Sequence, residues 1–224
     1  SSVIFGIGVF LFWYLLFPHA LGFQEQNQLF LFTWDFFVER MSVSGGLADY
    51  IAEFFTQFSY IPVLGEVLTA LLFVAFQLSV ALAIGRNEWY ALSFVPPVLL
   101  LVYMCDIYVM LSFLVALTVA VLLCALYRRR PGIIWASVAT FFGYWLIGPA
   151  IFVFAIYVPV RERNCKSLLV TLAAVLAVAV SKFTYLQQYP WKTVISGINY
   201  YRMALTVPAM QIAVTAAALI PAFT

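Results

Sequence analysis

Residues Ile107 to Arg130 read IYVMLSFLVALTVAVLLCALYRRR, an uncharged apolar run that ends in three arginines. A run of about 20 apolar residues is long enough to cross the hydrocarbon core of a bilayer as a helix. The whole chain has the same character, since 66% of its 224 residues are hydrophobic and only 9% are charged. The runs are continuous and do not alternate with period two, so the sequence predicts an all-α, polytopic membrane protein. A net charge of +2 is too small to indicate a nucleic-acid partner.

Six further apolar runs can be marked on either side of this one. We predict seven to eight membrane segments in a single domain over residues 1–224, the eighth arising if the fifth run is a hairpin. The runs are Val3–Ala20, Ile61–Ile84, Tyr90–Met104, Ile107–Tyr127, Gly132–Val160, Ser167–Phe183 and Met203–Phe223. The start at Ser1 without Met and the end just after an apolar run leave open that this is the N-terminal part of a longer chain.

Basic residues orient the chain, because Lys and Arg are enriched in cytoplasmic loops. The cluster Arg128–Arg130 is therefore predicted to be cytoplasmic, which also places the N-terminus in the cytoplasm and residues 22–60 outside. The fifth run is ambiguous, because its 29 residues are interrupted by Gly143, Gly148 and Pro149. A single span and a broken hairpin remain open. The compact loop Arg161–Lys166 favours the hairpin.

Residues 22–60 form the external acidic loop, and they hold five of the nine acidic residues. We expect two amphipathic helices in the membrane interface, at about Gln28–Met41 and Leu47–Phe58. Each carries two acids at i,i+4, Asp35/Glu39 and Asp49/Glu53. These acids are either solvated polar faces or a carboxylate site that would bind a divalent cation or act as a general base. Membrane lipids are the expected surroundings of the aromatic faces.

The order of one run, a large loop with acidic helices and then closely spaced runs resembles integral-membrane glycosyltransferases of the GT-C architecture. That resemblance covers the N-terminal third and implies transfer from a lipid-phosphate-linked sugar donor. It implies Glu25 and Asp35 as catalytic residues, although Glu25 lacks an adjacent acid between Gln24 and Gln26. His19, Arg40, Lys192 and Arg202 would then bind the substrate; interfacial snorkelling is the alternative for Lys192 and Arg202.

The stretch QEQNQLFLFTWDFFVERMSVSGGLADYIAEFFTQF, from Gln24 to Phe58, is also similar to the opening of an uncharacterised family of polytopic bacterial inner-membrane proteins. This second resemblance implies a multi-pass protein of the bacterial inner membrane and names no activity. The alternative to an enzyme is therefore a non-enzymatic membrane subunit or scaffold of a cell-envelope complex, with other membrane-protein subunits as partners.

Overall fold

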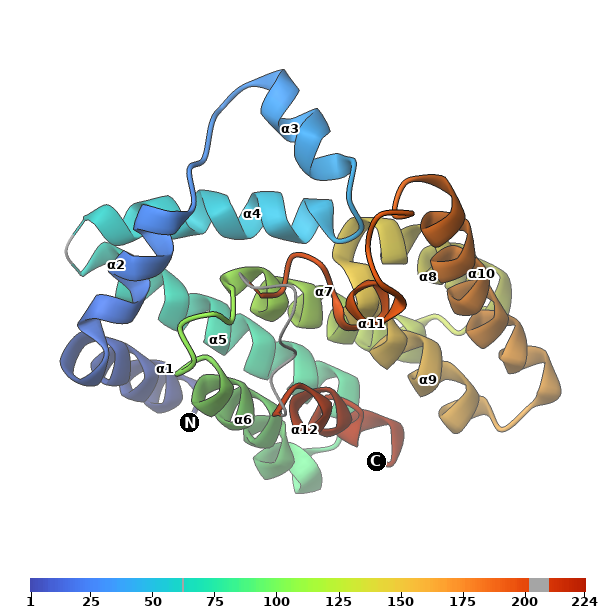
Figure 1. Ribbon diagram of the computed structural model, residues 1–224. Helices are drawn as coiled ribbons and strands as arrows, with labels where there is room; N and C mark the ends of the chain where they lie inside the picture. The colour runs from blue at the N-terminus through green and yellow to red at the C-terminus, as the bar shows by residue number, and fades with distance from the viewer. Residues whose placement is uncertain (62, 202–209) are drawn as a thin grey trace.

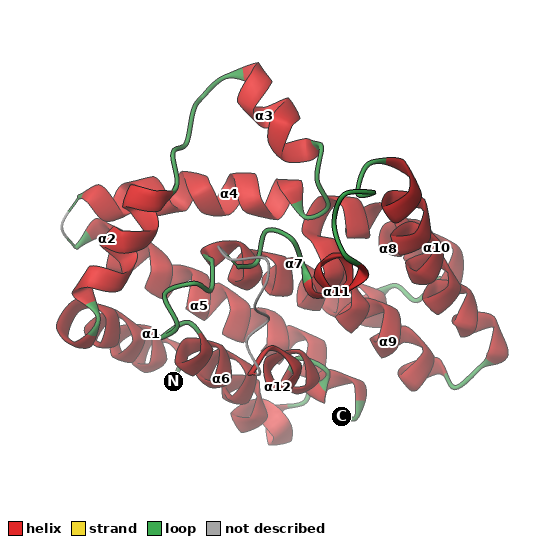
Figure 2. Ribbon diagram, viewed as in Figure 1, coloured by secondary structure: helices red, strands yellow, loops and turns green. Residues whose placement is uncertain are grey.

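A computed structural model of the chain describes residues 1–61, 63–201 and 210–224. It is 80% helical, and the described residues contain no strand (Figure 2). The predicted all-α class is therefore confirmed. The helices, in chain order, are α1 (Ser2–Leu11), α2 (Pro18–Asn27), α3 (Trp34–Met41), α4 (Gly46–Thr56), α5 (Leu64–Ile84), α6 (Val95–Tyr103), α7 (Leu111–Arg129), α8 (Ile133–Ile147), α9 (Ile151–Glu162), α10 (Leu168–Thr184), α11 (Trp191–Ser196) and α12 (Met210–Ala217) (Figure 1).

Four segments of the described chain are long and apolar enough to cross a membrane, which indicates a membrane-embedded protein. They are Leu64–Ile84, Leu111–Arg129, Ile133–Glu162 and Cys165–Thr184. The prediction of seven to eight segments is too high. The first run is helical from Ser2 to Leu16 but bends by 80° before the helix that follows, and counting this bent pair as one span gives five.

Prolines lie in two of the predicted runs that do not form straight spans, the first and the third. Pro18 begins a new helix at the 80° bend, and Pro96 and Pro97 stand in the first turn of α6, where a missing N–H is tolerated. The residues before α6, Asn87–Phe94, form a 3-10 helix, so α6 itself has only nine residues. The last predicted run falls partly outside the described residues, and α12 is short.

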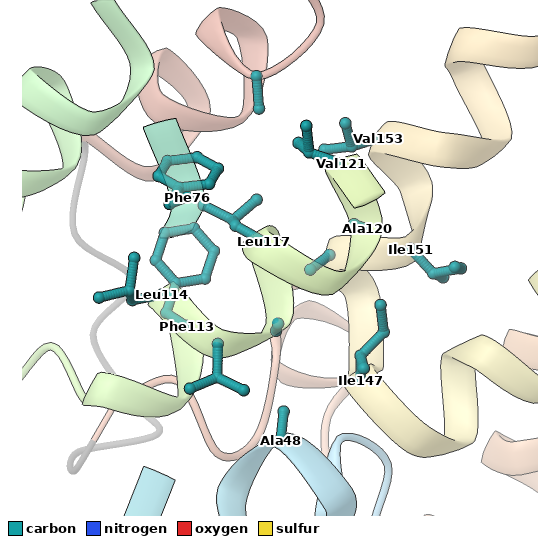
Figure 3. Packing of buried hydrophobic residues seen from close by; sticks show 14 of the residues in the cluster. Ala48, Phe76, Phe113, Leu114, Leu117, Ala120, Val121, Ile147, Ile151 and Val153 are labelled. Carbon is teal, nitrogen blue, oxygen red and sulfur yellow. The ribbon is translucent and has the colours of Figure 1, made fainter. Parts of the chain in front are cut away.

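The core is centred on α7, which packs against α4, α5 and α9. Its side chains Phe113, Leu117 and Val121 are fully buried, and Phe76 of α5 lies beside Leu117 and Val153 of α9 beside Val121 (Figure 3). Lipid chains are as apolar as these side chains, so moving the side chains from lipid into the bundle gains little from the hydrophobic effect. Close packing of the side chains against one another is what stabilises the interior of the bundle.

The predicted break in the fifth run is confirmed. Helix α8 ends at Ile147, and Gly148 adopts φ 70° and ψ −155°, a conformation that excludes continuation of the helix. The rings of Tyr144 and Phe152 stack with centroids 6.1 Å apart, whereas eight residues of continuous helix would separate them by about 12 Å along the axis. The chain therefore folds back at Gly148, so Ile133–Glu162, although long and apolar enough to cross a membrane, forms the α8–α9 hairpin and not one straight span.

Candidate functional site

The acidic layer comprises residues 28–60, in which α3 stands over the first half of α4 (Figure 1). Helix α3 begins later than predicted, at Trp34, because Gln28 is extended and the Thr33 hydroxyl caps the helix by accepting from the Phe36 N–H at 3.3 Å. The turn between α3 and α4 requires glycine at Gly46, since a Cβ there would lie 2.0 Å from the Arg40 carbonyl oxygen. This close turn directs Arg40 back over α4.

Arg40 lies between two buried carboxylates of α4. Its Nε donates to Glu53 Oε2 at 2.8 Å and lies 3.7 Å from Asp49 Oδ2. The guanidinium also lies over the Phe36 ring, 4.7 Å from its centroid. Asp49 and Glu53 are only 7% and 4% exposed, so the expectation of a solvated acidic face is wrong for α4.

Burial changes the protonation of this group. It raises the pKa of Asp49 to about 7, with a further rise from the charge of Glu53, and Arg40 opposes both effects. Burial also raises the pKa of Glu53, while the Arg40 hydrogen bond and charge act in the opposite direction. Near pH 7, Glu53 is therefore paired with Arg40, and Asp49 is partly protonated.

The acidic layer is fixed to the tip of the α8–α9 hairpin. Gly45 N–H donates to the Trp145 carbonyl at 2.8 Å, and the Trp145 indole donates to the Met41 carbonyl at 2.7 Å. At the break, the Ala150 N–H donates to the Tyr200 hydroxyl at 3.0 Å, and that hydroxyl donates to the Ile147 carbonyl. The polar groups freed by the break are thus satisfied, as buried backbone requires.

The other predicted site residues do not converge on Arg40. Glu25 is half-buried on α2, and Asp35 is exposed in the first turn of α3; within the described residues the two share no hydrogen bond or ion pair. His19 is exposed beside an apolar cavity of about 340 Å³. Lys192 is exposed at the start of α11, and Arg202 lies outside the described residues. Across the described chain, no three His, Cys, Asp or Glu side chains are grouped to hold a metal ion.

In the sequence, Asp49 and Glu53 were identified as an i,i+4 pair of acids but were not among the predicted catalytic or substrate-binding residues. The signal was present in the neighbouring Ala48 and Ala52, which recur with the same spacing of four. These small residues let α4 approach α7 closely and are 1% and 0% exposed. That packing carries the adjacent acids out of solvent.

Charge is segregated between the two ends of the helix bundle. At one end, the basic end, arginines line two cavities. The first is lined by Arg86, Arg128 and Arg129, and the second by Arg86, Arg161 and Arg163. The opposite end holds the acidic layer, the first turn of α5 with Glu66, and the turn at Asp106, which α2 reaches through a 2.8 Å hydrogen bond from Gln24 to the Val109 carbonyl. Both ends of the α8–α9 hairpin therefore lie at the basic end.

A family model described as a family of unknown function (DUF6057) matches residues 1–224. The chain belongs to this family. No curated protein and no solved structure matches it significantly. The expected membership of an uncharacterised family is thereby confirmed, and the match names neither a glycosyltransferase nor a bacterial inner membrane. Any function must consequently be argued from the geometry described above.

Proposed function

We propose that this protein is a non-enzymatic subunit of a bacterial inner-membrane complex, in which the acidic layer docks another membrane protein. The N-terminus and the basic end would lie in the cytoplasm, as positive charge favours. The acidic layer would then face outward. The observation that carries the proposal is an exposed apolar strip on this layer, defined as residues Leu29 to Trp34.

The strip presents large apolar side chains on a firm base. Leu29, Phe32 and Trp34 are 68%, 84% and 74% exposed. Between them, Phe30 points into the layer, where its ring lies 5.0 Å from that of Tyr50 and 5.5 Å from that of Phe54. Contiguous exposed apolar surface of this kind marks an interaction site.

Backbone polarity favours a protein partner over the hydrocarbon of the bilayer. Residues 29–32 are not helical, and within the described chain their N–H groups donate no hydrogen bond. Each unsatisfied backbone group costs several kcal/mol in hydrocarbon, on the order of the desolvation penalty of an amide. A partner that covers the strip can offer apolar contact and carbonyl acceptors together.

The test is photo-crosslinking in native membranes with a reactive amino acid at Phe32. We expect one protein adduct of defined mass, which is lost when Trp34→Ser removes the neighbouring contact. Phe183, 70% exposed on α10, is the matched control and should give lipid adducts. Lipid adducts alone at Phe32 would refute the docking role.

A second candidate is glycosyl transfer from a lipid-phosphate-linked donor by a GT-C-like mechanism. It is favoured by Asp49, whose pKa of about 7 suits a general base, beside the cation Arg40. Glu25→Gln, Asp35→Asn and Asp49→Asn should then each lower sugar transfer from a polyprenyl-phosphate donor, by about 100-fold for the true base. If the wild-type protein transfers no sugar but the Phe32 adduct forms, the glycosyltransferase role is excluded and the subunit role is supported.

A further inference from the structure

A cavity of about 570 Å³ lies at the basic end, where the C-termini of α5 and α7 meet. Its polar wall is made by Arg86, Arg128, Arg129 and Tyr90, and its apolar wall by Leu78 and Leu82 of α5. It is separate from the acidic layer, which is at the opposite end of the bundle. The proposed docking role makes no use of it.

Arg128 is held in place before any ligand arrives. Its Nη2 donates to the Gly85 carbonyl at 3.2 Å and its Nη1 to the Leu82 carbonyl at 3.4 Å, so it satisfies carbonyls at the end of α5. Gly85 is needed for this arrangement, because it has φ 58° and because a Cβ there would lie 1.0 Å from Arg128 Nη1. The remaining N–H groups of the guanidinium are free to face the cavity.

The cavity carries uncompensated positive charge. Among the described residues, none of its three arginines forms an ion pair with a carboxylate within 4 Å, and the ion pairs that are formed belong to Arg40. Glu88, nearby in sequence, does not line the cavity. Three guanidinium groups around one space attract an anion with several oxygen acceptors, and phosphate is the group that arginine binds in this way.

The apolar wall favours a phosphate that belongs to a lipid over a free phosphate ion. Leu78 and Leu82 are 44% and 46% exposed and lie on the outer surface of a segment long enough to span the bilayer. Acyl chains can lie along this surface while the headgroup reaches the arginines, which stand at the ends of two such segments. A soluble anion would gain nothing from the leucines.

We infer that this cavity binds the phosphate headgroup of an anionic phospholipid. Basic pockets between membrane helices on the cytoplasmic side are suited to such lipids. Arg86 and Arg129 would contact the phosphate as exposed donors, and Arg128 as the donor held by the carbonyls of α5. Gly85 would be a positioning residue.

The test uses the purified full chain, delipidated in a neutral detergent and titrated separately with phosphatidylglycerol, phosphatidylcholine and inorganic phosphate. The melting temperature reports binding, since a ligand of the folded state stabilises it by mass action. We expect a saturable rise with phosphatidylglycerol. The double variant Arg86→Gln/Arg129→Gln should raise the apparent Kd about 30-fold, because it removes two charges near the membrane surface. Phosphatidylcholine and inorganic phosphate should raise it far less.

Arg130→Gln is the matched control, because it removes the same charge at the same end outside the cavity. Equal weakening by Arg130→Gln would overturn the site in favour of a diffuse surface charge. Binding of inorganic phosphate as tight as that of phosphatidylglycerol would overturn the lipid assignment. Gly85→Ala provides a second variant, and unchanged lipid affinity there would overturn the positioning role of Gly85.

Discussion

At the scale of single residues, Arg40 is the informative side chain. The resemblance to glycosyltransferases implied that it binds a substrate phosphate, yet its Nε is taken by Glu53 at 2.8 Å. A buried carboxylate without a cation would be strongly unfavourable, so Arg40 makes the burial of α4 tolerable. The arrangement leaves Asp49, at 3.7 Å, as the less tightly paired acid.

The raised pKa of Asp49 predicts a pH-dependent stability. Because its folded-state pKa of about 7 exceeds the ordinary value of 3.8, Asp49 contributes stability fully below about pH 4, and that contribution is lost as the pH rises towards 7. The slope is at most about 1.4 kcal/mol per pH unit for one proton. Asp49→Asn should flatten the melting temperature between pH 4 and pH 7, measured in detergent.

Asp35→Asn is the control for this measurement, because Asp35 is exposed in the first turn of α3. It should leave the slope of the wild-type protein in place. An Asp49→Asn protein that follows the wild-type profile throughout would show that Asp49 titrates as it does in the unfolded chain.

At the scale of elements, the α8–α9 hairpin shows how a short break directs the fold. Gly148 provides a backbone conformation that other residues adopt only with strain, and its Cα lies against Gly45 of the acidic layer. A Cβ on Gly148 would also lie 3.0 Å from the Tyr200 hydroxyl. One glycine thus joins three parts of the chain.

Gly148→Ala should lower the free energy of unfolding by about 1–3 kcal/mol, the range for a non-glycine residue in such a conformation. Chemical denaturation in detergent measures it. Gly8→Ala is the matched substitution in α1, where a Cβ meets nothing within 4 Å and alanine is favoured in a helix by about 1 kcal/mol. Equal stability of the two variants would contradict a strained Gly148.

The elements differ in how far sequence could predict them. Long apolar runs such as Leu64–Ile84 were found with nearly correct ends, because length and hydropathy alone determine them. The break at Gly148 was readable from glycine and proline. The burial of Asp49 and Glu53 could not be predicted, because it depends on α7 covering α4. The spacing of the acids along the sequence is the same whether the helix face is solvated or buried. The distance between Glu25 and Arg40 likewise depends on tertiary packing.

At the scale of the molecule, the separation of charge specifies an orientation. Arg86, Arg128, Arg129, Arg161 and Arg163 surround adjoining cavities at one end, while the acidic layer is at the other. On the proposal made above, the protein would insert with its basic end in the cytoplasm, as the enrichment of Lys and Arg in cytoplasmic loops favours. The hairpin makes this possible, since it returns Arg161 and Arg163 to the end at which Arg128 lies.

Cysteine labelling in intact cells tests the orientation. Cys165 is exposed at the basic end and serves as the native probe, and Ser42→Cys, in a background without Cys105, Cys124 and Cys165, places an exposed probe in the acidic layer. A membrane-impermeant maleimide should label Ser42→Cys in intact cells and Cys165 only after lysis. The reverse pattern would invert the proposed topology.

The hydrogen bond from Trp145 to the Met41 carbonyl joins residues 104 positions apart. A ribosome adds about 5–20 residues per second, so some 5–20 seconds separate the synthesis of these two partners. During that interval α3 and α4 have emerged without the hairpin on which they rest. The nascent chain therefore exposes the aromatic side chains of α3 and α4 before the hairpin is synthesised. An insertase or chaperone that covers these side chains would have to bind during this interval.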